Sequence, residues 1–376
     1  CRLLQAFGAS IEEIPSAYEG RTAYCVKGGL TKQGEALTVD CGESGSTLRF
    51  LIPVGLYSGN TVVYTGRGQL VKRPLEPYYR IFDEHGVSYE PTEGGLPLTV
   101  EGCLQPGRYA LAGDVSSQFF TGLLVMLPLL DGDSVLESTT PLESLSYVTM
   151  TLDCMARHGV DVQWDGGRLF HIPGNQQYMA GTYAVEGDYS QAAFWLAAGT
   201  LGHPVECLGL RHSSSQGDEV IVSILQRMGA VIGQADSIAA HPSQLTGQVI
   251  DVEDCPDLVP ILAVAASCGQ GTTHIIHGAR VRLKECDRLH AIATELNKIG
   301  GCVEEEPDGL IIRGVGVLTG GRVSGWNDHR IAMALAIASQ RCSDELIIEG
   351  AECVRKSYPD FWQDFAKLGG IYRVEE

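Results

Sequence analysis

The sequence predicts an α/β fold of two similar domains, each built from three β-α-β-α-β-β units. Six times a helical pattern ends at a glycine that precedes a short extended run, at Gly8, Gly86, Gly159, Gly229, Gly300 and Gly369. A spacing of about 70 residues indicates one structural unit used repeatedly. Glycine readily adopts the left-handed conformation, so we expect each one to end a helix. We place the domains at residues 1–185 and 186–376.

Composition bounds the class of protein. The 376 residues are 44% hydrophobic and 19% charged, which suits two soluble globular domains. No apolar run approaches the roughly 18 residues that a membrane span requires. The net charge of −19 argues against nucleic acid or an anionic membrane as partner, so an anionic ligand would need a local cluster of cations. The twelve cysteines are scattered, as in reduced cytoplasmic proteins. His274 and His277 should lie on opposite faces of a strand, and we expect no metal site.

Polar or basic residues precede several expected helices of the first domain. Residues 40–50 fit a strand end, a Gly/Ser turn with Gly45, and an apolar helix whose N-terminus can bind an anion. The same pattern also fits an ordinary helix cap. Arg73 stands before Pro74, which should start a helix at Leu75. Arg73 is a candidate anion ligand, although an exposed loop charge is the plainer interpretation.

Two further helix starts in this domain carry hydroxyl groups. Ser116, Ser117 and Gln118 precede an apolar stretch, residues 119–130, which is expected to be a buried helix. Ser144 and Tyr147 stand before a helix that should run to Arg157. Such groups can cap the helix or bind a phosphate.

In the second domain, Asp257 precedes an expected buried helix at residues 261–268, with Pro260 tolerated in its first turn. The carboxylate either caps that helix or points at a substrate hydroxyl. Arg330 stands before an expected helix at residues 331–339, and Lys356 before the last helix.

Residues 280–288 combine four cationic and two anionic side chains. An apolar stripe that follows predicts a helix from near Leu283, which would put Lys284 and Arg288 on one face and Glu285 about 100° away. An anion could bind between the cations, although a solvated, salt-bridged helix start has equal weight on this stretch alone. In a repeat fold such helix ends can converge, which would join Arg49 to the basic residues already named.

Taken together, these motifs resemble the EPSP synthase family (3-phosphoshikimate 1-carboxyvinyltransferases) of bacterial type. The resemblance covers the whole chain and rests on several segments in order: CGESGSTLRF, KRP, SSQ, VEGDYSQA, PDLVP, RLKECDR, NDHR and VRKSYPDF. It implies an inverse α/β barrel in each of two domains, with helix N-termini facing the cleft between them. It also implies transfer of the enolpyruvyl group of phosphoenolpyruvate to the 5-hydroxyl of shikimate 3-phosphate, in the shikimate pathway of aromatic amino acid biosynthesis.

The resemblance also implies roles for residues. Shikimate 3-phosphate would be held by Ser116, Ser117, Gln118, Ser144, Tyr147, Asp257 and Lys284. Phosphoenolpyruvate would be held by Gly45, Arg73, Gln118, Arg288, Arg330 and Lys356. Asp257 would accept the hydroxyl proton, Glu285 would protonate the methylene carbon, and Lys284 would lie between both substrates. No cofactor or metal is implied, and we expect a cytoplasmic monomer.

Two alternatives stay open at this point. The sister UDP-N-acetylglucosamine enolpyruvyl transferase shares fold and donor, but its loop cysteine motif is not found here. A non-catalytic anion-binding protein would also suit the fold. The repeat period suggests that about 60 residues of the first unit are missing, including a segment that carries a catalytic lysine in the family. We therefore expect weak or no activity from this chain by itself.

Overall fold

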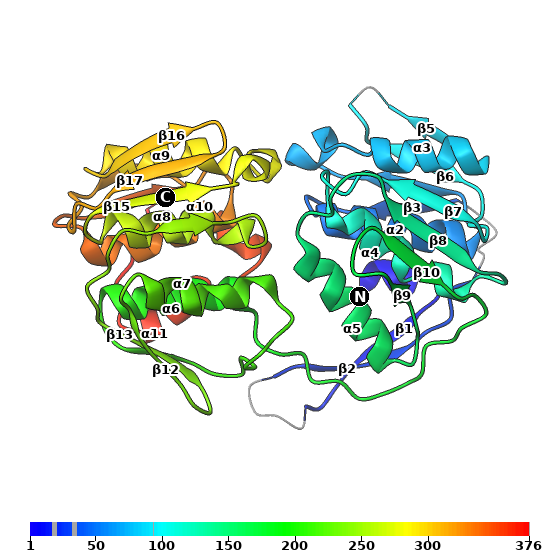
Figure 1. The fold of residues 1–376 in the computed structure, drawn as a ribbon, viewed down its shortest axis with the longest axis horizontal. Coiled ribbons are helices and arrows are strands. Elements are labelled where there is room, and N and C mark those ends of the chain that lie inside the picture. Colours follow the sequence, from blue (N-terminus) through cyan, green and yellow to red (C-terminus); the bar gives the residue numbers. More distant parts are fainter. Residues whose placement is uncertain (17–20, 32–35, 93, 376) are drawn as a thin grey trace. The chain divides into compact units, whose positions relative to one another are not determined.

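The computed structural model describes residues 1–16, 21–31, 36–92 and 94–375. The chain divides into two compact units, Cys1–Gly181 (unit 1) and Thr182–Glu376 (unit 2), which are drawn in Figure 1. The expected domain boundary after residue 185 lies shortly beyond this division.

The predicted repeat appears as three sheets of identical topology. Their strand orders are β3-β4-β6-β5, β7-β8-β10-β9 and β14-β15-β17-β16. In each sheet the first strand pairs parallel with the second, and the remaining pairs are antiparallel. A helix crosses over between the two parallel strands, as parallel pairing requires.

Unit 1 contains an initial hairpin and two complete repeats (Figure 1). Its helices are α1 (Arg2–Ala6), α2 (Gly45–Ser58), α3 (Glu76–His85), α4 (Ser117–Leu124) and α5 (Leu145–Arg157), with short 3-10 turns η1 (Gly68–Lys72) and η2 (Leu127–Leu129). Its strands are β1 (Ser10–Ile14), β2 (Ala23–Lys27), β3 (Leu37–Asp40), β4 (Val62–Thr65), β5 (Ser88–Pro91), β6 (Leu98–Glu101), β7 (Arg108–Leu111), β8 (Ser134–Ser138), β9 (Gln163–Trp164) and β10 (Leu169–Ile172).

Unit 2 repeats the same alternation of strands and helices. Its helices are α6 (Tyr189–Leu201), α7 (Ile221–Arg227), α8 (Val259–Ser267), α9 (Arg288–Lys298), α10 (His329–Ala338) and α11 (Phe361–Lys367). Its strands are β11 (Val205–Cys207), β12 (Val231–Gln234), β13 (Ile238–His241), β14 (Val249–Asp251), β15 (Thr272–Ile276), β16 (Cys302–Glu306), β17 (Gly309–Arg313), β18 (Gly321–Ser324) and β19 (Leu346–Glu349). Its 3-10 turns are η3 (Gly217–Val220), η4 (Pro256–Leu258), η5 (Ala279–Leu283), η6 (Ser339–Arg341) and η7 (Ala351–Lys356).

The six repeat glycines behave as predicted. All have positive φ, from 68° at Gly86 to 109° at Gly8, and Gly86 is the left-handed residue that ends α3. The prediction of a strand after Gly369 is wrong, because described residues 370–375 form none. The strands that follow the other glycines pair with neighbours, and backbone hydrogen bonds of that kind define a strand.

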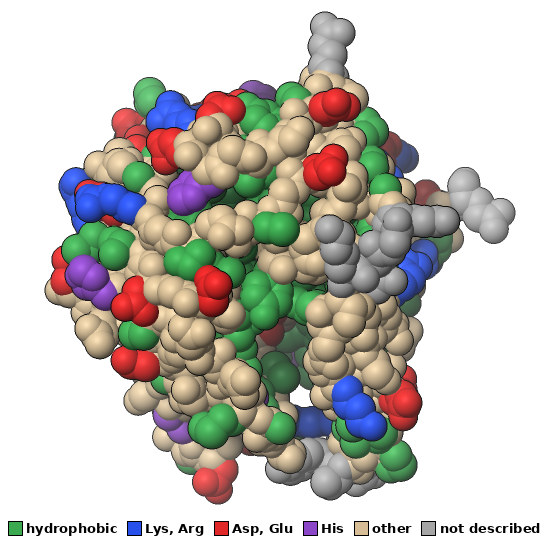
Figure 2. Space-filling model, turned by 90° about the vertical axis from the view of Figure 1, so that its right-hand side faces the viewer, with side chains coloured by type: hydrophobic (Ala, Val, Ile, Leu, Met, Phe, Trp, Pro, Cys, Tyr) green, Lys and Arg blue, Asp and Glu red, His purple; other side chains and the backbone are tan. Residues whose placement is uncertain are grey.

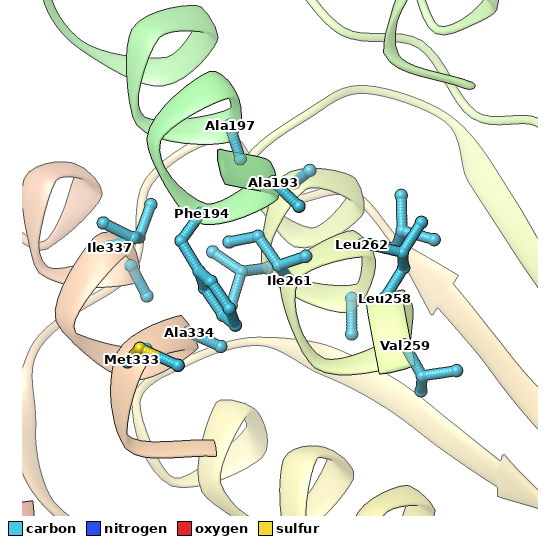
Figure 3. Packing of buried hydrophobic residues seen from close by; sticks show 14 of the residues in the cluster. Ala193, Phe194, Ala197, Leu258, Val259, Ile261, Leu262, Met333, Ala334 and Ile337 are labelled. Carbon is cyan, nitrogen blue, oxygen red and sulfur yellow. The ribbon is translucent and has the colours of Figure 1, made fainter. Parts of the chain in front are cut away.

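Unit 2 has its core between three buried helices. Helices α6, α8 and α10 pack against one another, and every residue of α8 is buried, as predicted for residues 261–268. In Figure 3, Phe194 of α6 points between Ile261 of α8 and Ala334 of α10. Burying a side chain of this size contributes roughly 1.5–3 kcal/mol. This packing fixes the helix N-termini that carry the expected site residues.

In unit 1, helix α4 packs against both α2 and α5. Its glycine Gly122 permits the close approach, because a Cβ there would lie 2.6 Å from the carbonyl oxygen of Arg49 in α2. The expected helix at residues 119–130 is shorter than predicted: α4 ends at Leu124, and η2 follows. Both segments are nonetheless largely buried, so the prediction of an apolar core segment is confirmed.

The predicted helix start near Leu283 is wrong. Helix α9 begins at Arg288, and Asp287 caps it by accepting a hydrogen bond from the backbone N–H of His290 at 3.1 Å. Lys284, with φ of −83° and ψ of −148°, lies outside the helix, so it does not share a helix face with Arg288. The predicted apolar stripe is correct, since Leu289, Ile292 and Leu296 are fully buried. A strong cap overrides a helical pattern that extends beyond it.

The surface agrees with the composition. None of the helices in the described ranges combines the length and apolar character that a membrane crossing requires. On the face shown in Figure 2, acidic and basic side chains lie among polar and hydrophobic ones.

Candidate active site

The first group of expected site residues gathers at the N-termini of α2 and α4 in unit 1. Ser44 caps α2 by accepting a hydrogen bond from the N–H of Thr47, and Arg49 follows one turn later, almost completely buried. The Arg49 guanidinium donates to Gln118 Oε1 at 2.8 Å and to the carbonyl oxygen of Pro74 at 3.1 Å. Burial lowers the pKa of Arg49 to about 10, and the charge of Arg73 acts in the same direction. Arg49 therefore stays a cation near neutral pH.

Gln118 links the two helix ends. Its amide donates to Ser46 Oγ at 2.8 Å, while its carbonyl oxygen accepts from Arg49. Ser116 caps α4 and accepts from the backbone N–H of Gln118 at 3.3 Å, and Ser117 is buried in the first turn. Gln118, Ser46, Ser116 and Arg49 thus form one hydrogen-bonded cluster. Its hydroxyl, amide and guanidinium groups can donate hydrogen bonds to the oxygen atoms of a ligand.

Gly45 and Arg73 lie in close contact. A Cβ at Gly45 would be 2.7 Å from Arg73 Nη1 and 3.5 Å from Gln118 Oε1. The Arg73 guanidinium therefore lies over the N-terminus of α2, where only glycine leaves room for it. A guanidinium beside free backbone N–H groups favours a bound anion.

Ser144 and Tyr147 occupy the start of α5. Ser144 is buried and has the left-handed φ of 52°, and Tyr147 lies in the first turn. The preceding N–H of Glu143 donates to the carbonyl oxygen of Gly113 at 3.1 Å. This bond ties the start of α5 to the loop that leads into α4.

In unit 2, Arg288 is the centre of the second group. Its side chain is only 1% exposed and contacts three carboxylates: Nη1 to Asp257 Oδ1 at 2.6 Å, Nη2 to Glu285 Oε2 at 2.7 Å, and Nε to Asp328 Oδ2 at 2.7 Å. Charge-assisted bonds of this length are among the stronger ones in proteins. The two expected catalytic carboxylates, Asp257 and Glu285, are therefore held by one guanidinium.

Asp257 is surrounded by cations. Besides Arg288, Arg330 Nη2 lies 3.2 Å and Lys284 Nζ 3.6 Å from its oxygens. Burial alone would raise its pKa, but the three cations outweigh burial and hold the pKa of the Asp257 carboxyl well below its usual value. Asp257 is thus an ionised acceptor.

Lys284 and Glu285 lie in a turn between η5 and α9. Arg282 fixes this turn, because it donates to Asp287 Oδ2 at 2.8 Å and to Glu305 Oε1 at 2.6 Å. Attraction to Asp257 would raise the pKa of Lys284, but burial and neighbouring guanidinium groups lower it overall.

Arg330 and Lys356 meet the network through the loop before α10. Asp328 caps α10, accepting from the N–H of Arg330 at 2.8 Å while it binds Arg288. Lys356 Nζ donates to the carbonyl oxygen of Asn327 at 2.7 Å. The structure thus connects Asp257, Lys284, Glu285, Arg288, Arg330 and Lys356, all expected from the sequence.

Asp218 and Asp328 were not among the expected site residues. Asp218 is 3% exposed, and Ser190 Oγ donates to its Oδ2. Burial, together with the charge of Asp257, raises the pKa of Asp218 to about 6, although Arg330 opposes this. Asp328 stood within the NDHR motif, and Asp218 is marked only by its place before an apolar helical run.

A metal-ligand geometry occurs elsewhere. Among the described residues, Asp251, Glu253 and His277 place ligand atoms within 4.8 Å of one another, and all three are exposed. None of them is an expected site residue.

The two polar clusters provide fixed cations that can bind anionic groups and carboxylates that can transfer protons.

Known proteins are similar to this chain over most of its length. The family model described as EPSP synthase (3-phosphoshikimate 1-carboxyvinyltransferase) matches residues 1–365. Proteins named 3-phosphoshikimate 1-carboxyvinyltransferase are similar: that of Clostridium kluyveri is 51% identical over 371 residues, covering 98% of this chain and 86% of its own. That of Clostridium novyi is 49% identical over 374 residues, with the same two coverages. A 2.37 Å structure of EPSP synthase from Acinetobacter baumannii has a TM-score of 0.81 at 26% identity, covering all of this chain and 88% of the other.

Proposed function

This chain belongs to the EPSP synthase family, the 3-phosphoshikimate 1-carboxyvinyltransferases, and from this premise we propose a role for each residue of the two clusters. The enzyme transfers the enolpyruvyl group of phosphoenolpyruvate to the 5-hydroxyl of shikimate 3-phosphate and releases phosphate. This is a step of the shikimate pathway, which supplies aromatic amino acids. The sister transferase that uses UDP-N-acetylglucosamine is not favoured, since the relatives reported above carry the shikimate name.

Unit 1 provides most of the groups for shikimate 3-phosphate, and Asp257 and Lys284 of unit 2 complete the set. The hydroxyls of Ser116, Ser117 and Ser144 stand at two helix N-termini, where backbone N–H groups and the helix dipole favour a phosphate. Tyr147 adds a phenol for the ring hydroxyls. Gln118 contacts the substrate pair, and its bonds to Ser46 and Arg49 fix its orientation.

Phosphoenolpyruvate carries a phosphate and a carboxylate and therefore requires several cations. Arg73 over Gly45, together with Gln118, binds it from unit 1, and Arg288, Arg330 and Lys356 bind it from unit 2. Guanidinium groups suit both anions because they donate two parallel hydrogen bonds. Cations fixed in advance stabilise the departing phosphate without reorganising.

Two carboxylates and a lysine carry out the proton transfers. Asp257 accepts the proton of the 5-hydroxyl as its oxygen attacks C2 of phosphoenolpyruvate, and Glu285 gives a proton to C3. The tetrahedral intermediate then loses phosphate as Glu285 takes a proton back from the new methyl group. Lys284 lies beside Asp257 and stabilises the charge that passes between the substrates. The observation that carries this assignment is Arg288, which holds Asp257 at 2.6 Å and Glu285 at 2.7 Å.

The compartment, the oligomeric state and the roles of the two domains are also proposals. We propose that the enzyme acts as a monomer in the cytoplasm, with residues 1–185 as the shikimate-side domain and residues 186–376 as the second domain. Light scattering of the purified protein would give its mass in solution.

The test is phosphate release from shikimate 3-phosphate plus phosphoenolpyruvate, with Asp257→Asn compared to the unsubstituted protein. We expect the substitution to lower kcat by roughly 10²–10⁴-fold, the usual contribution of a positioned base. Asp254→Asn is the matched control, because it removes an equal charge from an exposed residue three positions earlier and should leave kcat unchanged. Phosphate release with UDP-N-acetylglucosamine in place of the shikimate substrate would overturn the assignment. A kcat of Asp257→Asn equal to that of the unsubstituted protein would overturn the role of Asp257 as the proton acceptor.

A further inference from the structure

A fully buried carboxylate lies next to the loop that leads into α10, the helix of Arg330. Glu295 of α9 is 0% exposed. Its Oε1 accepts from the indole Nε1 of Trp326 at 2.7 Å, and its Oε2 accepts from the backbone N–H of Ser324 at 3.0 Å. Lys298 Nζ, on the next turn of α9, lies 2.8 Å and 2.9 Å from the two oxygens. A carboxylate buried this deeply persists only with such a set of partners.

The segment held by Glu295 has an unusual backbone. Trp326 and Asn327 are consecutive non-glycine residues with φ of 52° and 51°. The left-handed region is unfavourable for residues other than glycine, so two in a row require support from their surroundings. Ser324 Oγ accepts from the backbone N–H of Trp326 at 3.1 Å, and His290 packs edge-on against the indole at 5.6 Å between ring centres. Glu295 supplies the charge-assisted bonds of this support.

The turn at Trp326 and Asn327 sets three groups of the site. The carbonyl oxygen of Asn327 accepts the bond from Lys356 Nζ at 2.7 Å. The next residue, Asp328, caps α10 and binds Arg288, and Arg330 follows in the first turn of that helix. A change in the path of residues 326 and 327 would therefore displace the ammonium of Lys356 and the start of α10 together.

We infer that Glu295 is a positioning residue for the phosphoenolpyruvate end of the site, acting through Trp326 on the turn that aims Lys356 and Arg330. The inference rests on the proposed function in taking these two cations as ligands of phosphoenolpyruvate. Glu295 touches no substrate, so its effect is on the placement of other groups. Most of the groups that hold shikimate 3-phosphate belong to unit 1, so we expect a far smaller effect on the binding of that substrate.

The test compares Trp326→Phe, Glu295→Gln and Glu295→Ala with the unsubstituted protein in steady-state phosphate release. Trp326→Phe keeps an aromatic ring beside His290 but removes the donor, so the fold should be retained. We expect KM for phosphoenolpyruvate to rise roughly tenfold or more, while KM for shikimate 3-phosphate changes less than twofold, since small misplacements of binding groups have effects of up to about a hundredfold. Glu295→Gln keeps one acceptor oxygen and should have a smaller effect than Glu295→Ala.

A matched control is Glu349→Gln. This carboxylate lies on β19, which pairs with the strand of Ser324, but it forms an exposed ion pair with Arg322 at 2.7 Å. Its loss should leave both KM values unchanged. The double variant Glu295→Ala with Trp326→Phe should have the same KM for phosphoenolpyruvate as Glu295→Ala. The reason is that Glu295→Ala already removes the acceptor of the Trp326 hydrogen bond.

The outcomes separate the inference from the proposed function. An unchanged KM for phosphoenolpyruvate in Trp326→Phe overturns the positioning role while leaving the activity standing. Equal rises in both KM values mean a general loss of structure and also overturn it. Phosphate release with UDP-N-acetylglucosamine in place of shikimate 3-phosphate counts against the proposed function instead. A Glu295 variant that fails to fold leaves the decision to Trp326→Phe.

Discussion

Replacing Arg288 by Met would test the charge network of unit 2. Methionine keeps much of the length and apolar surface of the side chain but removes the guanidinium from three carboxylates. Asp257 would retain two cations, Arg330 at 3.2 Å and Lys284 at 3.6 Å. The fully buried Asp328 would lose its ion pair with the Arg288 guanidinium, whose Nε lies 2.7 Å from Oδ2. The cost is therefore concentrated at Asp328. Removing one partner of a buried ion pair typically costs about 3–5 kcal/mol of unfolding free energy, and we expect a loss in that range near pH 7.5.

The pH dependence of this loss has a definite sign. Burial opposes the charged form of Asp328, but in the folded protein Arg288 outweighs burial and lowers the pKa of Asp328. A carboxyl with a lowered pKa stabilises the fold above its unfolded pKa, and this contribution disappears as the pH falls through the folded value. Without Arg288, burial would raise the pKa instead, so the charged form would destabilise the fold until acid neutralises it. The difference between the two proteins should therefore narrow as the pH falls from 7.5 toward 4.5.

Urea unfolding followed by circular dichroism at the two pH values measures this difference. Arg322→Met is the control, because its ion pair with Glu349 is exposed and such pairs contribute at most about 1 kcal/mol. A loss below about 1 kcal/mol for Arg288→Met, or a difference that is the same at both pH values, would refute the reasoning from a buried, unpaired carboxylate.

Two further predictions concern Gly45 and Asp218. Gly45→Ala places a Cβ 2.7 Å from Arg73 Nη1, so the flexible guanidinium must move; KM for phosphoenolpyruvate should rise about tenfold with little change in melting temperature. Gly28→Ala, which meets open space, is the control, and an unchanged KM in Gly45→Ala would contradict the contact. Burial raises the pKa of Asp218 to about 6, so the folded protein loses stability as the pH rises from the usual carboxyl pKa of about 4 to that value. Asp218→Asn removes this cost, and its stability relative to the unsubstituted protein should increase by about 2 kcal/mol between pH 4.5 and 7.5 in urea unfolding; a constant difference would exclude the raised pKa.

The sequence by itself determined the repeat and most of the helix starts. Six glycines at a regular spacing mark helix ends because the left-handed conformation they adopt is a local property of the backbone. Ser116, which caps α4, was found for a similar reason, since a helix N-terminus needs acceptors for its free N–H groups. The family resemblance named most residues of both clusters but neither Asp218 nor Asp328, and the roles that it implies are proposals.

Only the tertiary structure decided how those residues are paired. Helical periodicity put Lys284 and Arg288 on one face, whereas the cap at Asp287, which is also bonded to Arg282, makes the helix begin at Arg288, after Lys284. Arg288 reaches Asp257 and Asp328 across 31 and 40 residues of sequence, distances at which no local pattern predicts contact. The raised pKa of Asp218 and the bond from Trp326 to Glu295 likewise depend on burial, because a charged group acquires these properties only when packing removes it from water.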